Sequence, residues 1–473
     1  MKNKTYIHFR NYLGGDLLVA LIGALTIPVL TNVLSVSEYG VLNVFMSYVS
    51  ICSVILLFNV HSAVGRYYYE EKNNFNKFLG TTLILSVVML IFFSIIFFFW
   101  HIEISVFSGF SYKYQIFIFL LVIFAVGEGV FRQIFQAKLK SGFLSVINVI
   151  KALSILILTV LIIFFIQDEK YVGPVYARLI VGGILFFYAL YILRDTIDLV
   201  FHTEHVKYIV NYSVPLIPYA LSSIILAQFD RVMVNYYEGP ESAGLYSFAY
   251  NIGFLISLVI TALNSSFYPK FFGYYNKQEY HQHDQEITGL HNFLLIASLF
   301  LILFGKEIGL ILAPSEFNES LNVIPVVVIS YVFYSLFVIY NRNIDFSKKT
   351  YYSSAILLLA GSVNVLLNIY FIPKYGFIAA AYTTLVSYIL LFLLSWYISK
   401  YMLKIHTFSI VKLIIPMIYL SPIIIAIFLY EYFYETIIIS FFLKIIFLII
   451  TIRIIYPSIF GIAKNMILKR KIL

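Results

Sequence analysis

The residues with the clearest capacity for chemistry are charged side chains inside long apolar stretches. In GEGVFRQ, Glu128 and Arg132 stand four positions apart, so a helix places them on one face. Lys151 lies about as far after the turn KLKSG as Glu128 lies before it, and Arg178 belongs to the next apolar stretch. Ionisable groups within a membrane are costly and usually functional. These bases therefore predict a water-filled cationic cavity that binds an anionic ligand.

Nearby charges suggest a second role and leave a structural alternative open. Asp16 lies in the first apolar stretch, and Arg66 stands at the end of the second. Arg66 would join the bases, whereas Asp16 and Glu128 would balance them and could carry a coupling proton or cation; no other cofactor is expected. In the alternative interpretation, Glu128, Arg132 and Lys151 form an ion-pair network that satisfies itself. Arg66 would then only reach the lipid head groups.

Asp230 and Arg231 are adjacent in another apolar stretch, less than two helical turns before the loop EGPES. Neighbouring positions of a helix point in different directions, so the two side chains should not pair with each other. We expect one to face a cavity or a neighbouring helix and the other to reach the interface. A structural lock at an outer gate and a contact with substrate both fit this placement.

Other charged motifs have simpler explanations. HQHDQE contains His281 and His283 and could suggest a metal site, but it has no partner cluster in the sequence, which favours a solvated loop. Glu307 lies where anchoring at the interface suffices, and for Lys444 we expect snorkelling or a structural role. The chain has no phosphate-binding loop, nucleophile elbow or HExxH motif, and only one cysteine. We therefore expect neither an enzyme nor a metal site.

The composition of the chain indicates which kind of secondary structure carries these residues. Of the 473 residues, 61% are hydrophobic and 12% are charged, whereas soluble domains are roughly 45–50% apolar and about 25% charged. Lipid must therefore surround most of the chain, and a helix that crosses it needs about 20 apolar residues. About fourteen such stretches are found, at 11–33, 40–65, 78–100, 114–137, 141–166, 172–194, 208–236, 243–269, 286–312, 322–344, 351–373, 376–400, 408–430 and 436–461.

The basic residues set the orientation of these spans. The net charge is +9, but the lysines and arginines lie between the apolar stretches, so we do not expect nucleic acid as a partner. Most of them fall on the side that holds the N-terminus, and this bias places that side in the cytoplasm. An even number of spans then places the C-terminus in the cytoplasm as well.

The sequence also contains an internal repeat. Residues 131–160 resemble residues 340–369, and Gly40 and Gly244 each follow a short acidic loop and open the next helix. The repeats begin and end on the same side, so they are parallel and related by an axis along the membrane normal. This predicts an all-α membrane protein of two parallel six-helix lobes plus a C-terminal helical pair, which suits alternating access. The predicted parts are 1–200 (N-lobe), 201–405 (C-lobe) and 406–473 (helical pair).

Two stretches resemble the polysaccharide exporters, the Wzx-type oligosaccharide flippases. Residues 26–70, which begin TIPVLTNVLSVSEYG, are similar to the opening helical pair of that family. Residues 229–271, which begin FDRVMVNYYEGPESAGLYSF, are similar to the stretch that opens its second lobe. That stretch has an Asp near the end of one helix, G-x-Y at the start of the next and a Pro at its close. The matching residues here are Asp230, Gly244, Tyr246 and Pro269.

The resemblance extends along the chain and implies the multidrug/oligosaccharidyl-lipid/polysaccharide fold. It implies a flippase for oligosaccharide linked to undecaprenyl diphosphate in a bacterial inner membrane, with membrane lipids and other polysaccharide-assembly membrane proteins as further partners. The cationic lumen of the family supports roles for Arg132, Lys151 and Arg178. A cation-coupled drug exporter of the same superfamily and a flippase for peptidoglycan or teichoic-acid precursors are the alternatives.

Overall fold

In a computed structural model of the chain, the described residues 2–57, 60–434 and 437–455 are almost entirely helical and contain no strand. Thirteen helices in this part are long and apolar enough to cross a membrane. The fourteenth predicted span, 436–461, coincides with α18 (Ile437–Ile455), and both of its ends lie outside the described residues. The prediction of an all-α membrane protein with about fourteen spans is confirmed.

The helices pack into two compact units, which are described separately. Unit 1 comprises Met1–Phe248, Leu312–Glu319 and Ser353–Ser387, and unit 2 comprises Ala249–Ile311, Ser320–Tyr352 and Tyr388–Leu473. The two units are defined by which parts of the backbone lie close together, whereas the predicted lobes were defined by the sequence repeat. The division into two lobes therefore stays a prediction.

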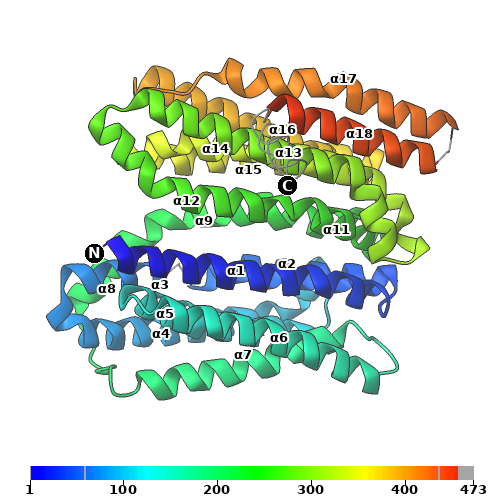
Figure 1. Ribbon diagram of the computed structural model, residues 1–473. Helices are drawn as coiled ribbons and strands as arrows, with labels where there is room; N and C mark the ends of the chain where they lie inside the picture. The colour runs from blue at the N-terminus through cyan, green and yellow to red at the C-terminus, as the bar shows by residue number, and fades with distance from the viewer. Residues whose placement is uncertain (1, 58–59, 435–436, 456–473) are drawn as a thin grey trace, which may run out of the picture. The chain divides into compact units, whose positions relative to one another are not determined.

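The first ten helices belong to unit 1. They are α1 (Lys2–Thr31), α2 (Val36–Leu57), α3 (His61–Glu70), α4 (Phe75–Ser108), α5 (Tyr112–Ala137), α6 (Ser141–Phe165), α7 (Val172–Leu193), α8 (Thr203–Ser213), α9 (Ile217–Ile224) and α10 (Asp230–Glu238). Within this unit α5, α6 and α7 run side by side (Figure 1). The turn between α5 and α6 is only three residues long, 138–140, so the two helices are antiparallel neighbours.

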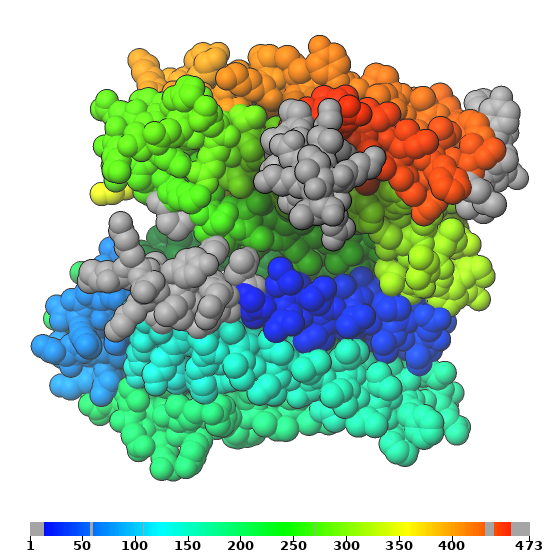
Figure 2. Space-filling view, viewed as in Figure 1, coloured from blue at the N-terminus to red at the C-terminus, as the bar shows by residue number. Residues whose placement is uncertain are grey.

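The outer surface of unit 1 is apolar. Figure 2 shows α6 and α7, in cyan to blue-green, as one continuous surface. On these two helices Phe164, Phe165, Ile184 and Phe187 are all more than 60% exposed. Apolar side chains in this density are expected on a surface that faces lipid rather than water.

The remaining helices lie wholly or partly in unit 2. They are α11 (Pro240–Phe254), α12 (Ile256–Lys277), α13 (Tyr280–Leu312), α14 (Ile324–Phe346), α15 (Tyr351–Tyr375), α16 (Phe377–Tyr397), α17 (Ile410–Tyr434) and α18. The C-terminal helices α17 and α18 pack on α13 through an apolar cluster of Leu299, Leu303, Phe304, Ile427 and Phe447.

A buried ion pair joins α18 to α13. The Lys444 side chain is fully buried, and its Nζ lies 2.7 Å from Glu307 Oε1. Of the two roles expected for Lys444, the structural one holds and snorkelling does not, and the expectation of interfacial anchoring for Glu307 was wrong. The partners are 137 positions apart, so neither motif shows that helix packing brings them together. A buried pair of this kind satisfies both charges but depends on the presence of each.

Removing either partner of this pair should destabilise unit 2. Lys444→Ala or Glu307→Gln leaves an uncompensated buried group, which typically costs about 3–5 kcal/mol. We expect a clearly lower melting temperature of the purified protein in detergent, whereas Lys306→Ala, at an exposed neighbouring position, should not change it. Replacing both partners with leucine should recover most of the loss. Equal melting temperatures for Lys444→Ala and Lys306→Ala would contradict this role.

Candidate functional site

The first candidate group lies on α5 and α6, where two predicted site residues meet. Lys151 Nζ is 2.5 Å from Glu128 Oε2, as their similar distances from the intervening turn predict. The Lys151 and Glu128 side chains remain 28% and 40% exposed. The pair is therefore only partly buried.

Two further predicted bases, on α5 and α7, form no ion pair with an acid among the residues that the structure describes. Arg132 lies one turn after Glu128 and is exposed, and in the described part of the chain it forms no ion pair and no hydrogen bond. Arg178 is half-buried and donates from Nη1 to the carbonyl oxygen of Pro174, 3.0 Å away on the same helix. Of the ion-pair network considered for Glu128, Arg132 and Lys151, only the Glu128–Lys151 pair is therefore present within the described segments. These four side chains comprise three bases and one acid, and the ion pair joins Lys151 to Glu128.

Two other predicted residues lie apart from this pair. Arg66 Nε is 2.6 Å from Glu70 Oε1 on an exposed face of α3, and its guanidinium lies 5.0 Å from the centre of the Tyr212 ring. Hydrogen bonds from Tyr208 and Arg66 hold the pKa of Glu70 below its usual range. This local pairing fits the surface interpretation of Arg66. Asp16 is exposed on α1 and has no hydrogen bond or ion pair within the described segments.

The second candidate group surrounds Asp230, at the start of α10. A single π-helical turn, η3 (Ile225–Phe229), precedes it; such turns are frequent at functional sites. Asp230 is only 2% exposed, and its carboxylate accepts hydrogen bonds from Tyr246 Oη at 2.9 Å and from Asn368 Nδ2 at 2.7 Å. Thr384 Oγ1 is a third donor. A buried carboxylate is therefore held by neutral groups of α11, α15 and α16.

The polar shell continues beyond the carboxylate. Asn368 Nδ2 lies 3.2 Å from Asn364 Oδ1, and Thr383 Oγ1 donates to Asn368 Oδ1. Arg231 is also buried, and its Nη1 donates to Gln228 Oε1. Both Asp230 and Arg231 are buried, so our expectation that one of them reaches the interface was wrong. The cluster offers oxygen atoms and one acidic group, which is chemistry suited to a proton or a cation.

A third group, in unit 2, was missed at the sequence level. Arg342 on α14 is only 5% exposed, and its Nε and Nη2 donate to Asn264 Oδ1 at 3.1 and 2.6 Å. It lies 4.8 Å from the centre of the Phe267 ring. In the sequence Arg342 resembles the other bases near the ends of spans, and no local pattern singles it out.

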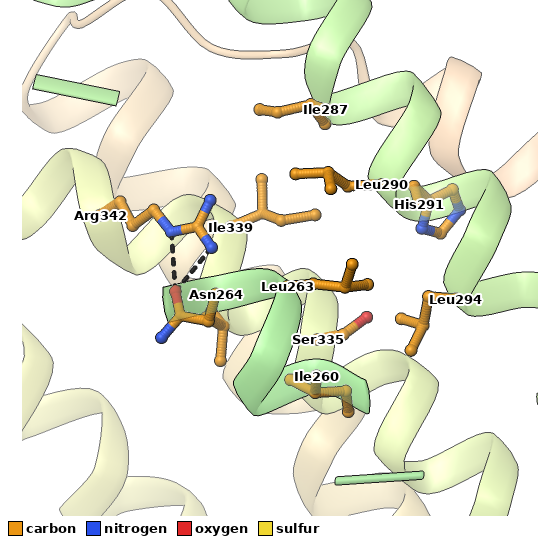
Figure 3. Close-up of a pocket in the computed structure, with 11 residues that line it drawn as sticks. Ile260, Leu263, Asn264, Ile287, Leu290, His291, Leu294, Ser335, Ile339 and Arg342 are labelled. Carbon is orange, nitrogen blue, oxygen red and sulfur yellow. Dashed lines mark hydrogen bonds between the residues drawn. The ribbon is translucent and has the colours of Figure 1, made fainter. Parts of the chain in front are cut away.

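Arg342 lines a small pocket between α12, α13 and α14. The cavity holds about 40 Å³. In Figure 3, Arg342 and Asn264 lie on one side of it and His291 and Leu294 on the other. Most of the remaining lining is aliphatic, and Arg342 has no ion-pair partner in the described part of the chain. A buried guanidinium held by a neutral amide is a second place where an anion would be stabilised.

Comparison with known proteins places these features in a family. Residues 11–274 match the model of a family described as polysaccharide biosynthesis protein. A protein of the Lsg locus of Haemophilus influenzae is 21% identical over 389 residues, which cover 78% of this chain and 93% of that protein.

Solved structures of transporters share the fold. The lipid II flippase MurJ, in an inward closed conformation, aligns with a TM-score of 0.71 and 17% identity over 97% of this chain and 99% of its own. An inward-facing multidrug resistance MATE family transporter of the MOP superfamily aligns with a TM-score of 0.66 and 14% identity, over 82% and 96% of the two chains. At these identities the likeness shows the fold alone.

Proposed function

The chain belongs to the polysaccharide biosynthesis protein family, and from this membership we propose that it is a flippase for lipid-linked oligosaccharide. Its substrate would be an oligosaccharide repeat unit on undecaprenyl diphosphate, carried from the cytoplasmic to the outer leaflet of a bacterial inner membrane. The product would serve the assembly of a surface polysaccharide such as O-antigen or capsule.

The observation that carries this proposal is the excess of bases over acids among the candidate residues of α5, α6 and α7, namely Arg132, Lys151 and Arg178 against Glu128. A diphosphate with attached sugars cannot cross hydrocarbon unaided, because its charges and hydroxyls would lose their hydration. Arg132, Lys151 and Arg178 supply cationic donors, and hydrogen bonds between such donors and phosphate are the strong ones. Three bases to one acid leave net positive charge for the ligand. The lipid tail can stay in the bilayer throughout.

We further propose that the two sequence repeats act as lobes in alternating access, with both termini in the cytoplasm. Parallel repeats related by an axis along the membrane normal are typical of transporters that rock around a fixed site. Asp16, Glu128 and Asp230 are the candidates for coupling this motion to a proton or a cation. Asp230 is favoured, because it is buried and its carboxylate accepts hydrogen bonds from the neutral side chains of Tyr246, Asn368 and Thr384.

One alternative substrate shares the same chemistry. The MurJ-like fold also suits a lipid-linked precursor of peptidoglycan or teichoic acid, since those carriers present the same diphosphate. A drug exporter of the MATE type would need an excess of acids to attract organic cations. The α5–α7 group has an excess of bases, which favours the lipid-linked anion.

The experiment that tests the function is deletion of the gene in its own host. Surface polysaccharide and lipid-linked oligosaccharide on the cytoplasmic leaflet are measured together. Loss of the first with accumulation of the second supports the flippase and yields the glycan for analysis. Intact surface glycan with new sensitivity to cationic drugs would replace it with the exporter, and arrested cell-wall synthesis would point to a peptidoglycan precursor.

Lys151→Ala or Arg132→Ala should abolish surface polysaccharide without lowering the amount of protein in the membrane. A hydrogen bond to a charged group contributes about 1.5–3 kcal/mol, so substrate affinity should fall roughly 10- to 100-fold. Lys113→Ala, which removes an exposed base from α5, is the matched control and should behave as the unmodified protein. Normal glycan output from both Lys151→Ala and Arg132→Ala would refute the cationic site.

A further inference from the structure

Unit 2 contains a cluster of metal-ligand side chains that the proposed transport function does not use. His283 and Asp284 lie near the start of α13, and His406 lies in the segment between α16 and α17. His283 Nδ1 is 2.9 Å and His406 Nε2 is 3.0 Å from the same atom, Asp284 Oδ1. The three ligand atoms all lie within 4.8 Å of one another. Helix packing thus supplies the partner that HQHDQE lacks in the sequence.

The side chains of this cluster are held in place by their neighbours. His283 is only 2% exposed, and its ring lies 5.8 and 5.6 Å from the ring centres of Phe267 and Phe271. The His406 ring stacks on Tyr280, with the centroids 4.4 Å apart. The imidazoles are therefore oriented before any ligand arrives, which is how outer residues prepare a metal site.

A hydrogen bond from Tyr275 holds the backbone at His406 in place. The Tyr275 hydroxyl lies 2.5 Å from the carbonyl oxygen of His406 and 2.9 Å from Asn343 Oδ1. The segment that carries His406 is thereby tied to α12.

From this geometry we infer that His283, Asp284 and His406 bind a divalent transition-metal ion, with zinc as the preferred candidate. Two imidazole nitrogens and one carboxylate oxygen are the ligand types that zinc takes in proteins. In a tetrahedral site with bonds of about 2.0–2.1 Å, ligand atoms lie roughly 3.3 Å apart, and the two spacings to Asp284 are close to this value. Water would complete the coordination.

The bound ion would cross-link two parts of unit 2. Asp284 neutralises one of its charges, and the two histidines bind it through neutral nitrogens. The ion would connect the start of α13 to the segment 403–409, which leads into α17. Metal binding that requires the folded arrangement adds its binding free energy to stability. Zinc should therefore raise the melting temperature of the whole chain.

The test uses the full-length protein, purified in detergent with its affinity tag removed and then stripped with a chelator. Zinc is added, excess ion is removed, and the metal retained per protein is measured by mass spectrometry alongside the melting temperature. We expect one zinc per chain and a higher melting temperature. Bound cobalt should give the intense visible absorption of tetrahedral coordination.

Variants identify the ligands. His406→Ala alters a half-buried residue outside the helices and should fold, yet its zinc affinity should be at least about 10-fold lower. Asp284→Asn should weaken zinc binding in the same way. His281→Ala, at an exposed position two residues before His283, should retain one zinc and the full rise in melting temperature.

Two results would overturn the inference. One is an unmodified protein that retains no zinc after loading, in which case Asp284 only accepts hydrogen bonds from the two histidines. The other is equal zinc retention by His406→Ala and the unmodified protein, which would place the ion elsewhere. Because metal retention and melting are measured without transport, either result leaves the flippase proposal standing.

Discussion

Asp230→Asn should abolish the dependence of transport on an ion gradient and lower outward flipping at least about tenfold. The amide has the shape of the carboxylate and can still accept from Tyr246 and Thr384, but it can neither bind a proton at neutral pH nor neutralise a cation. A difference of 1.4 kcal/mol in coupling free energy already corresponds to tenfold. The measurement is flipping of lipid-linked oligosaccharide in reconstituted vesicles under imposed proton and sodium gradients.

The matched control is Glu241→Gln, which removes an exposed acid at the start of α11 and should leave the ion dependence intact. Asp16→Asn and Glu128→Gln test the other two acids in the same assay. If the ion dependence disappears in one of these and persists in Asp230→Asn, coupling belongs to that acid. If Asp230→Asn lowers the melting temperature but leaves the ion dependence unchanged, Asp230 is a structural lock.

The spans could be predicted because hydrophobic periodicity and length are local properties of the sequence. The same holds for the Glu128–Lys151 pair, since a short turn forces α5 and α6 to be antiparallel and fixes which positions share a depth. Arg66 lay within reach of a local acid four positions away, and this i,i+4 pairing is also visible in the sequence. Local spacing therefore identified the pairing of Lys151 with Glu128, whereas the Arg66–Glu70 pair was not predicted although its spacing is visible in the sequence.

Partners that are distant in the sequence could not be found in this way. Asp230 was recognised as a charge within a span, but its donors Asn368 and Thr384 are 138 and 154 positions away. The pair of asparagines four residues apart on α15, Asn364 and Asn368, was the one local signal, because polar residues on one face of an apolar helix need partners. His406 is 122 positions from Asp284, and only the packed helices bring these two side chains together.

The two glycines matched by the sequence repeat contact each other in the structure. A Cβ added to Gly40 on α2 would lie 1.8 Å from the carbonyl oxygen of Pro240 and 2.7 Å from the backbone nitrogen of Gly244. A Cβ added to Gly244 on α11 would lie 2.0 Å from the carbonyl oxygen of Val36. Each copy of the repeated turn therefore packs against the backbone of the other. Such reciprocal contact is expected close to a twofold axis.

Gly40→Ala or Gly244→Ala should therefore impair transport severely, because real Cβ atoms essentially never approach backbone so closely and the starts of α2 and α11 must separate. Overpacking of this kind costs about 1–3 kcal/mol, so we expect a lower melting temperature and strongly reduced glycan export. Gly23→Ala is the matched control, because a Cβ at Gly23 in α1 meets no atom within 4 Å and alanine favours a helix. Export and melting unchanged in both Gly40→Ala and Gly244→Ala would show that α2 and α11 can separate without consequence. If melting falls while export is retained, the contact serves folding rather than the movement of the repeats.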